Sequence, residues 1–66
     1  MLLSIVVPVY NEEDNIQKFY TTVKDVLQTL DYDHEIIFVD DGSSDDSAGM
    51  LRYIGHQDPK VKVLLL

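Results

Sequence analysis

The hydrophobic positions of the chain fall into separate runs, and the spacing within each run indicates the element that it forms. Residues 2–9 (LLSIVVPV) are almost continuously apolar and rich in Ile and Val, which is typical of a strand covered on both faces. Pro8 stands at the C-terminal end of this run, where a missing N–H is tolerated. From Ile16 to Leu30 the apolar residues recur at steps of three and four, which predicts an amphipathic helix.

The second half of the chain repeats this alternation. A short β-branched and aromatic run at residues 35–39 predicts a second strand. A second helix is expected to begin within residues 43–46 and to end at Gly55, and residues 61–66 predict a third strand. The apolar face of the second helix is formed by Ala48, Leu51 and Ile54. The order β-α-β-α-β implies parallel strands with right-handed crossovers, so we predict an α/β fold, one half of a Rossmann-like open parallel sheet.

Length and composition narrow the classes of function. A chain of 66 residues forms one small domain at most, and a domain of this size buries only about 60% of its unfolded surface. Twelve acidic and five basic residues give a formal net charge of −7, which disfavours a nucleic-acid-binding surface. The absence of cysteine excludes disulfides and thiolate metal sites. No apolar run is long enough to span a bilayer, and the first run lacks a basic leader, so we expect no membrane anchor in this segment.

Two polar stretches follow the first two predicted strands, PVYNEE at residues 8–13 and DDGSSDD at residues 40–46. Because ligands of open parallel sheets bind beyond the carboxyl ends of the strands, we expect both loops to converge on one ligand. Asp40 and Asp41 would repel a bare phosphate, whereas carboxylates accept hydrogen bonds from a base N–H or from ribose hydroxyls. The residues therefore favour nucleoside recognition. A divalent cation such as Mg²⁺ or Mn²⁺, bridging carboxylates and phosphate, is the alternative.

Common nucleotide-binding fingerprints are missing, since the chain has neither G-x-G-x-x-G after the first strand nor a Walker lysine motif. Tyr10 offers a ring for base stacking, although an aromatic residue at a strand end also commonly fills the edge of a core. We expect Asn11 to cap the first helix. Asp45 and Asp46 are expected to stabilise the start of the second helix through its dipole.

The stretches SIVVPVYNEEDNI (residues 4–16) and EIIFVDDGSSDDS (residues 35–47) resemble the opening motifs of family 2 glycosyltransferases, the sugar-nucleotide enzymes of the A-type fold. The resemblance covers essentially the whole chain, and two spaced motifs are more specific than either alone. Within the family, the chain is most similar to polyprenyl-phosphate and dolichyl-phosphate sugar synthases. The resemblance implies that the chain binds the nucleoside part of a nucleotide-activated sugar donor.

The resemblance also implies roles for single residues. Asp40 matches the acidic residue that contacts the base. The turn that shapes the same pocket is matched by Asp41, Gly42 and Ser43. The first loop, which lines the nucleobase and ribose pocket, is matched by Pro8, Val9, Tyr10 and Glu12. The resemblance assigns no catalytic residue and no metal ligand to this chain.

The family's aspartate-x-aspartate motif, which holds the metal, has no match here, because DYD at residues 31–33 lies in the wrong connector. We therefore expect a divalent cation, Mg²⁺ or Mn²⁺, in a full-length enzyme with ligands mostly outside this chain. Residues 1–66 are expected to form a single partial domain, the N-terminal segment of a longer glycosyltransferase, inactive alone. That enzyme would act on a lipid-phosphate or saccharide acceptor in cell-envelope polysaccharide biosynthesis, in the cytoplasm or at the cytoplasmic face of a membrane.

Two other interpretations stay open. In the first, the chain is a non-enzymatic α/β module whose acidic loops bind a protein partner or a metal. In the second, it is a phosphoacceptor domain of the receiver type, which would need a further aspartate at the end of the third strand, where this chain has VKVLLL (residues 61–66). In addition, the Ile/Val-rich edge of the first strand would lie open, which predicts self-association through that edge.

Overall fold

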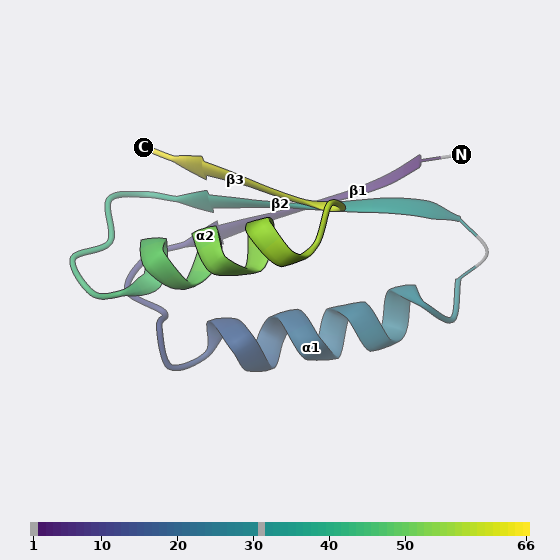
Figure 1. Ribbon diagram of the computed structural model, residues 1–66, viewed down its shortest axis with the longest axis horizontal. Coiled ribbons are helices and arrows are strands. Elements are labelled where there is room, and N and C mark those ends of the chain that lie inside the picture. Colours follow the sequence, from purple (N-terminus) through teal and green to yellow (C-terminus); the bar gives the residue numbers. More distant parts are fainter. Residues whose placement is uncertain (1, 31) are drawn as a thin grey trace.

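The computed structural model describes residues 2–30 and 32–66, which form a parallel sheet with helices on one side (Figure 1). The elements in chain order are β1 (Leu2–Val9), α1 (Ile16–Leu27), β2 (Asp33–Asp40), α2 (Ser47–Gln57) and β3 (Val61–Leu65). The strand order is β1-β2-β3, and both pairs of neighbours are parallel. Because crossovers between parallel strands are almost always right-handed, two that step in the same direction place both helices on one face. The predicted fold, a Rossmann-like half with β-α-β-α-β order, is confirmed.

The first helix is shorter at its C-terminal end than its hydrophobic spacing predicts. α1 ends at Leu27, whereas the apolar pattern continues to Leu30. The amides of Thr29 and Leu30 donate to carbonyls three residues back, those of Val26 and Leu27, at 3.1 Å each. The last turn therefore tightens toward 3₁₀ geometry, which the spacing of apolar residues does not reveal.

The second helix begins later and ends later than predicted. α2 starts at Ser47 and continues to Gln57, so the prediction that Gly55 ends it is wrong. Gly55 lies within the helix at a close approach to β3, because a Cβ at this position would be 3.3 Å from Cγ2 of Val63. Glycine here permits tight packing of the helix on the sheet rather than the end of the helix.

The hydrophobic core lies between the sheet and the two helices. Successive side chains of a strand point to opposite faces, so alternate residues of each strand meet the helices. Phe38 of β2 is 1% exposed, and its ring meets that of Phe19 edge-on with centroids 6.4 Å apart. The buried apolar residues come from all five elements and are Val9, Ile16, Leu27, Ile36, Phe38, Leu51, Ile54 and Val61.

The opposite face of the sheet is not covered by α1 or α2 (Figure 1). Val6 and Leu64 lie on this face with 63% and 54% of their surface exposed. A row of polar side chains crosses the same face, where Ser4 Oγ donates to Glu35 Oε1 at 2.6 Å and Lys62 Nζ donates to Glu35 Oε2 at 2.9 Å. The hydrogen bonds from Ser4 and then Lys62 lower the pKa of Glu35. Only one face of β1 is therefore buried, contrary to its continuous apolar pattern.

A polar cluster ties α1 to the N-terminal ends of β2 and β3. The Tyr20 hydroxyl donates to Oδ2 of Asp58 at 2.6 Å, and Lys24 Nζ lies 3.0 Å from the same oxygen. Lys24 Nζ also donates to Nε2 of His34 at 3.1 Å. The cluster lies at the sheet end away from the loops that follow β1 and β2. Neither α1 nor α2, the helices found in the described residues, has the length and hydrophobicity to cross a membrane.

Candidate functional site

Strand register brings the two polar loops to the same end of the sheet. In the parallel β1–β2 pair, Val9 lies opposite Asp40, so the loops that follow these residues start side by side (Figure 1). The Asp41 amide donates to the Val9 carbonyl at 2.9 Å, which extends the pairing past the last residue of β2. The two stretches that the sequence marked for one ligand therefore leave neighbouring strand ends together.

Asn11 connects the two loops. Its amide donates to Ser43 Oγ at 2.9 Å, and its Oδ1 accepts from the Ser44 amide at 2.8 Å and, over a longer distance of 3.4 Å, from the Asp45 amide. Its backbone adopts a left-handed conformation with φ of 51°. The prediction that Asn11 caps the first helix is wrong. α1 begins only at Ile16, and the side chain of Asn11 binds to the second loop instead.

Ser47, for which the sequence predicted no role, holds the same two segments together from the start of α2. Its side chain is fully buried, and Oγ accepts from the Glu12 amide at 3.0 Å. Asp45 accepts from the amides of Ser47 (Oδ1, 2.9 Å) and Glu13 (Oδ2, 3.2 Å). The Ser47 hydroxyl contributes most to a lowered pKa of Asp45, against the opposing effect of desolvation. Asp45 thus holds the first residue of α2 by the hydrogen bond from the Ser47 amide.

The adjacent carboxylates of the second loop lie in different environments. Asp40 is 3% exposed, and its Oδ1 accepts from the Ser43 amide at 3.3 Å and from the Ser43 hydroxyl. Asp41 is exposed. Gly42 follows with φ of +75°, a left-handed conformation that glycine adopts without strain, and it turns the chain back toward Asp40. The turn thus directs one carboxylate inward and leaves the other in solvent.

A cavity of about 210 Å³ lies beside the C-terminal end of β1 and the start of α1. Three of the predicted site residues, Pro8, Val9 and Glu12, line it together with the rings of Phe19 and Phe38. Tyr10, with 60% of its surface exposed, lies outside the cavity lining. The lining also lacks Asp40, Asp41, Gly42 and Ser43. The structure therefore separates the predicted residues into an apolar hollow and an acidic turn, with Tyr10 in the loop that begins at the hollow.

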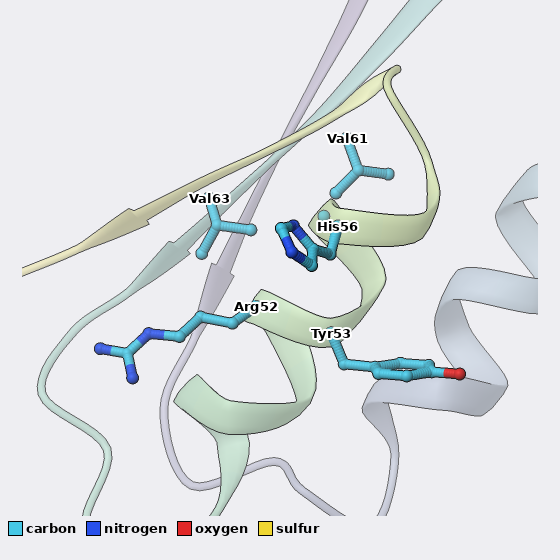
Figure 2. A pocket seen from close by; sticks show the side chains of 6 residues that line it. Arg52, Tyr53, His56, Val61 and Val63 are labelled. Carbon is cyan, nitrogen blue, oxygen red and sulfur yellow. The ribbon is translucent and has the colours of Figure 1, made fainter.

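A larger hollow of about 570 Å³ lies between α2 and β3 and contains none of the predicted site residues. Figure 2 shows Arg52 and His56 extending from α2 beside Val61 and Val63 of β3. Its polar groups are basic or neutral, so its chemistry differs from that of the acidic loops at the strand ends.

The acidic loops do not form a metal site by themselves. Within residues 2–30 and 32–66, no group of three or more His, Cys, Asp or Glu side chains is placed to hold a metal ion. Asp31 of the DYD stretch lies outside the described residues. One oxygen of the buried Asp40 carboxylate, Oδ1, already accepts the hydrogen bonds from Ser43. The described donor set therefore does not fit a divalent cation.

Comparison with known proteins gives consistent results for the whole stretch that contains both loops. Residues 4–66 match the family Glycosyl transferase family 2. The chain is 41% identical over 61 residues to the bactoprenol glucosyl transferase of Shigella phage SfV. These 61 residues cover 92% of this chain and 20% of that protein. It is 46% identical over 61 residues to an uncharacterized glycosyltransferase of Bacillus subtilis (strain 168), with 92% and 19% covered.

A further relative is the undecaprenyl-phosphate 4-deoxy-4-formamido-L-arabinose transferase of Klebsiella pneumoniae (strain 342), 47% identical over 49 residues, with 74% of this chain and 15% of that protein covered. The chain spans about a fifth, or less, of the length of these relatives. The resemblance to polyprenyl-phosphate sugar transferases is confirmed by these similarities. Because the family match includes both loops and nearly all of the chain, the protein belongs to glycosyltransferase family 2.

Proposed function

We propose that this chain is the N-terminal, nucleotide-sugar-binding segment of a longer glycosyltransferase, and that the loops after β1 and β2 together bind the nucleoside of the donor. The observation that carries this proposal is the register of Val9 with Asp40, which sets Tyr10 and Asp41 at adjacent strand ends. Ligands of open parallel sheets bind at this end. Similarity to named glycosyltransferases over 92% of the chain supports the enzyme class.

Asp41 is the better candidate for the carboxylate that reads the nucleoside. It is exposed, whereas Asp40 is buried and bound to Ser43. An exposed carboxylate is free to accept hydrogen bonds from a base N–H or from ribose hydroxyls. Asp40, Gly42 and Ser43 would then shape the turn. This assignment exchanges the roles that motif matching alone implies for the two aspartates.

The first loop supplies the apolar part of the proposed site. The exposed ring of Tyr10 is available to stack on a base, and such stacking tolerates any base. Pro8, Val9 and Glu12 border the cavity beside β1, where the base or ribose would enter. The Glu12 carboxylate is oriented by a hydrogen bond from Asn15 Nδ2 at 3.0 Å. Apolar walls with a few placed polar groups are typical of small-molecule sites.

In the complete enzyme, an acceptor oxygen would attack the anomeric carbon while the bond from that carbon to the nucleoside diphosphate breaks. The contribution of this chain is to bind and orient the nucleoside, so that the diphosphate leaves from a fixed position. A divalent cation, Mg²⁺ or Mn²⁺, is expected for the family. Since the described residues offer no fitting ligand set, the residues that hold such an ion would belong to other segments.

The relatives also support a proposal for the acceptor and the cellular location of the complete enzyme. One relative is named for transfer to undecaprenyl phosphate and another for glucosyl transfer to bactoprenol. Their similarity supports a polyprenyl-phosphate acceptor more than a saccharide. A lipid-linked acceptor would place the enzyme at the cytoplasmic face of a membrane, where nucleotide sugars are accessible.

We also propose that the chain self-associates through β1. This strand pairs with β2 on one side, and no strand of the described residues pairs with its other side. The Val9 carbonyl faces β2, so by alternation the backbone groups of Val6 and Pro8 face the open edge. Pro8 lacks an N–H, which limits pairing at that end of the strand. The remaining donors and acceptors form a template for a second copy.

Titration of the ¹⁵N-labelled chain with uridine diphosphate and guanosine diphosphate, in the presence of Mg²⁺, tests the proposed nucleoside site. We expect amide shifts to concentrate at residues 10–12 and 41–43 with at least one of the two ligands. Asp41→Asn should weaken binding about tenfold, because a charged hydrogen-bond acceptor is lost. Asp25→Asn on the exposed surface of α1 changes charge equally and should leave affinity unchanged. If neither loop showed ligand-dependent shifts, the proposal would be contradicted.

A further inference from the structure

We propose that Asn11 is a positioning residue that holds the two loops as one binding surface without itself contacting the nucleoside. We call the hydrogen bonds of Asn11 to Ser43, Ser44 and Asp45 the Asn11 bridge. The inference deepens the proposed function and rests on it, because the bridge connects the residues next to Tyr10 with those next to Asp41.

The Asn11 bridge runs in both directions between the loops. Asn11 donates through its amide to Ser43 Oγ (2.9 Å) and accepts through Oδ1 from the amides of Ser44 (2.8 Å) and Asp45 (3.4 Å). The Ser43 hydroxyl in turn donates to the buried carboxylate of Asp40. A continuous chain of hydrogen bonds thus extends from the exposed first loop to a fixed group at the end of β2.

The residue type suits this position for two physical reasons. With φ of 51°, Asn11 lies in the left-handed region, which asparagine, aspartate and glycine adopt more readily than other residues. Among these, glycine has no side-chain acceptor. Aspartate would add a negative charge beside the acidic stretch at residues 40–46, where like charges repel. Asparagine combines the backbone conformation with a neutral acceptor.

Other contacts hold the fold of the loops when the side chain of Asn11 is removed. The Glu12 amide donates to buried Ser47 Oγ at 3.0 Å, and the Glu13 amide donates to Asp45 Oδ2 at 3.2 Å. Neither bond involves Asn11, and Asn11 itself is exposed. Loss of its Oδ1 should therefore loosen Tyr10 relative to Asp41 while leaving the core intact. A ligand that requires both loops then binds to fewer of the populated conformations.

The test compares Asn11→Gly, which permits the left-handed backbone but lacks the acceptor, with Asn11→Asp, which restores an acceptor but adds a negative charge. In the nucleotide-free chain, we expect the amides of Ser44 and Asp45 to exchange with solvent more slowly than the amide of Gly42. In Asn11→Gly, exchange at Ser44 and Asp45 should quicken several-fold, and in Asn11→Asp it should be slower than in Asn11→Gly, because an acceptor is present again, but faster than in the parent because of the added charge. The denaturation midpoint should remain near that of the parent chain.

The functional measurement is the dissociation constant of each variant for whichever nucleotide the parent chain binds, uridine diphosphate or guanosine diphosphate. Asn11→Gly should raise this dissociation constant about fivefold, because the loss of the Oδ1 acceptor leaves the two loops less preorganised. An unchanged dissociation constant in a folded Asn11→Gly chain, or equal exchange at Ser44, Asp45 and Gly42 in the parent, would overturn the inference. If the parent binds neither nucleotide, the proposed function is wrong, and exchange alone then decides whether the Asn11 bridge joins the loops.

Discussion

At the scale of single residues, Asp40 and Asp41 show how strand geometry divides a pair of identical side chains. Asp40 is the last residue of β2 and shares its face with Ile36 and Phe38, so its side chain points toward the helices and is buried. The next residue leaves the strand, and its carboxylate is exposed. The alternation of side chains in a strand contains this information, although the motif DDGS does not.

Replacing each aspartate with alanine should separate their roles. Asp40→Ala removes the acceptor for the Ser43 amide and hydroxyl, so we expect a loss of about 1–3 kcal/mol in the free energy of unfolding. Asp41→Ala changes an exposed side chain and should alter that free energy by less than about 0.5 kcal/mol. Urea denaturation of the two variants measures both values. Equal losses would mean that Asp41 also has a structural role.

The hydrogen bond between Tyr20 and Asp58 should make stability depend on pH at both extremes. Burial and then the Asp58 hydrogen bond raise the pKa of Tyr20 from 10.0 to about 12. Its contribution to stability is therefore present below pH 10 and is lost between about pH 10 and 12. Burial opposes ionisation of Asp58, but hydrogen bonds from Tyr20, the Lys60 amide and Lys24 outweigh it and lower the pKa of Asp58 below 3.8. Its contribution is lost as pH falls below that value.

Tyr20→Phe tests this dependence. The variant should lose about 1 kcal/mol of stability at neutral pH and should show a weaker further loss between about pH 10 and 12 than the parent chain. Tyr53→Phe, at a position 65% exposed, is the matched control and should retain the alkaline profile of the parent. Denaturation midpoints measured across this pH range give the comparison. The same alkaline profile in all three proteins would rule out the role of Tyr20.

At the scale of elements, hydrophobic spacing predicted which segments are strands and helices, and local hydrogen bonding decided where they end. β1 has the predicted bounds, residues 2–9, because a continuous Ile/Val-rich run has few alternatives. α2 begins at Ser47, later than predicted, because the preceding residues are hydrogen-bonded to Asn11 of the first loop. Such contacts join residues more than 30 positions apart, so no local pattern in the sequence predicts them.

Replacement of Gly49 in α2 and of Gly42 in the second loop by alanine should change the free energy of unfolding in opposite directions. Gly49 lies within α2, where alanine is the better helix former, and its added Cβ would meet the Asp46 side chain, with Oδ1 the nearest atom at 2.6 Å. Because that side chain can rotate away, Gly49→Ala should stabilise the chain by about 0.5–1 kcal/mol. Gly42 has φ of +75°, so Gly42→Ala should destabilise it by about 1 kcal/mol although the space is open. Chemical denaturation distinguishes these outcomes, and equal signs would contradict the backbone argument.

The candidate site was predictable in its location but not in its internal organisation. The order of elements placed both polar loops at the carboxyl ends of parallel strands, and the structure brings them together there. The residues that join them are Asn11, which the sequence predicted as a helix cap, and Ser47, for which it predicted no role. Their actual partners lie on the other loop, at 2.8 to 3.0 Å. Only tertiary structure shows these pairings.

At the scale of the whole molecule, the sheet has helices on one face, and its other face exposes apolar side chains beside the row of polar ones. This arrangement leaves the side chains of Val6 and Leu64 in solvent and leaves the outer edge of β1 without a partner strand in the described part of the chain. Exposed apolar surface next to an open strand edge favours association. The proposed self-association follows from both features together.

Substitution of Val6 with lysine tests this association, because a charge at an edge strand opposes pairing and opposes burial of the sheet face. We expect the parent chain to sediment as a species heavier than its 7.6 kDa monomer at high concentration. Val6→Lys should shift it to the monomer. Val26→Lys, at a position on α1 with similar exposure (57% against 63%), should not. A parent chain that sediments as a monomer at high concentration would refute the association.

Intermolecular nuclear Overhauser effects in the nucleotide complex test most directly whether the two loops from neighbouring parallel strands bind a single nucleoside. We predict contacts from the base and ribose protons of one bound molecule both to the ring of Tyr10 and to the amides of Gly42 and Ser43. Contacts to one loop only, or to residues at the opposite end of the sheet such as His34, would contradict the claim.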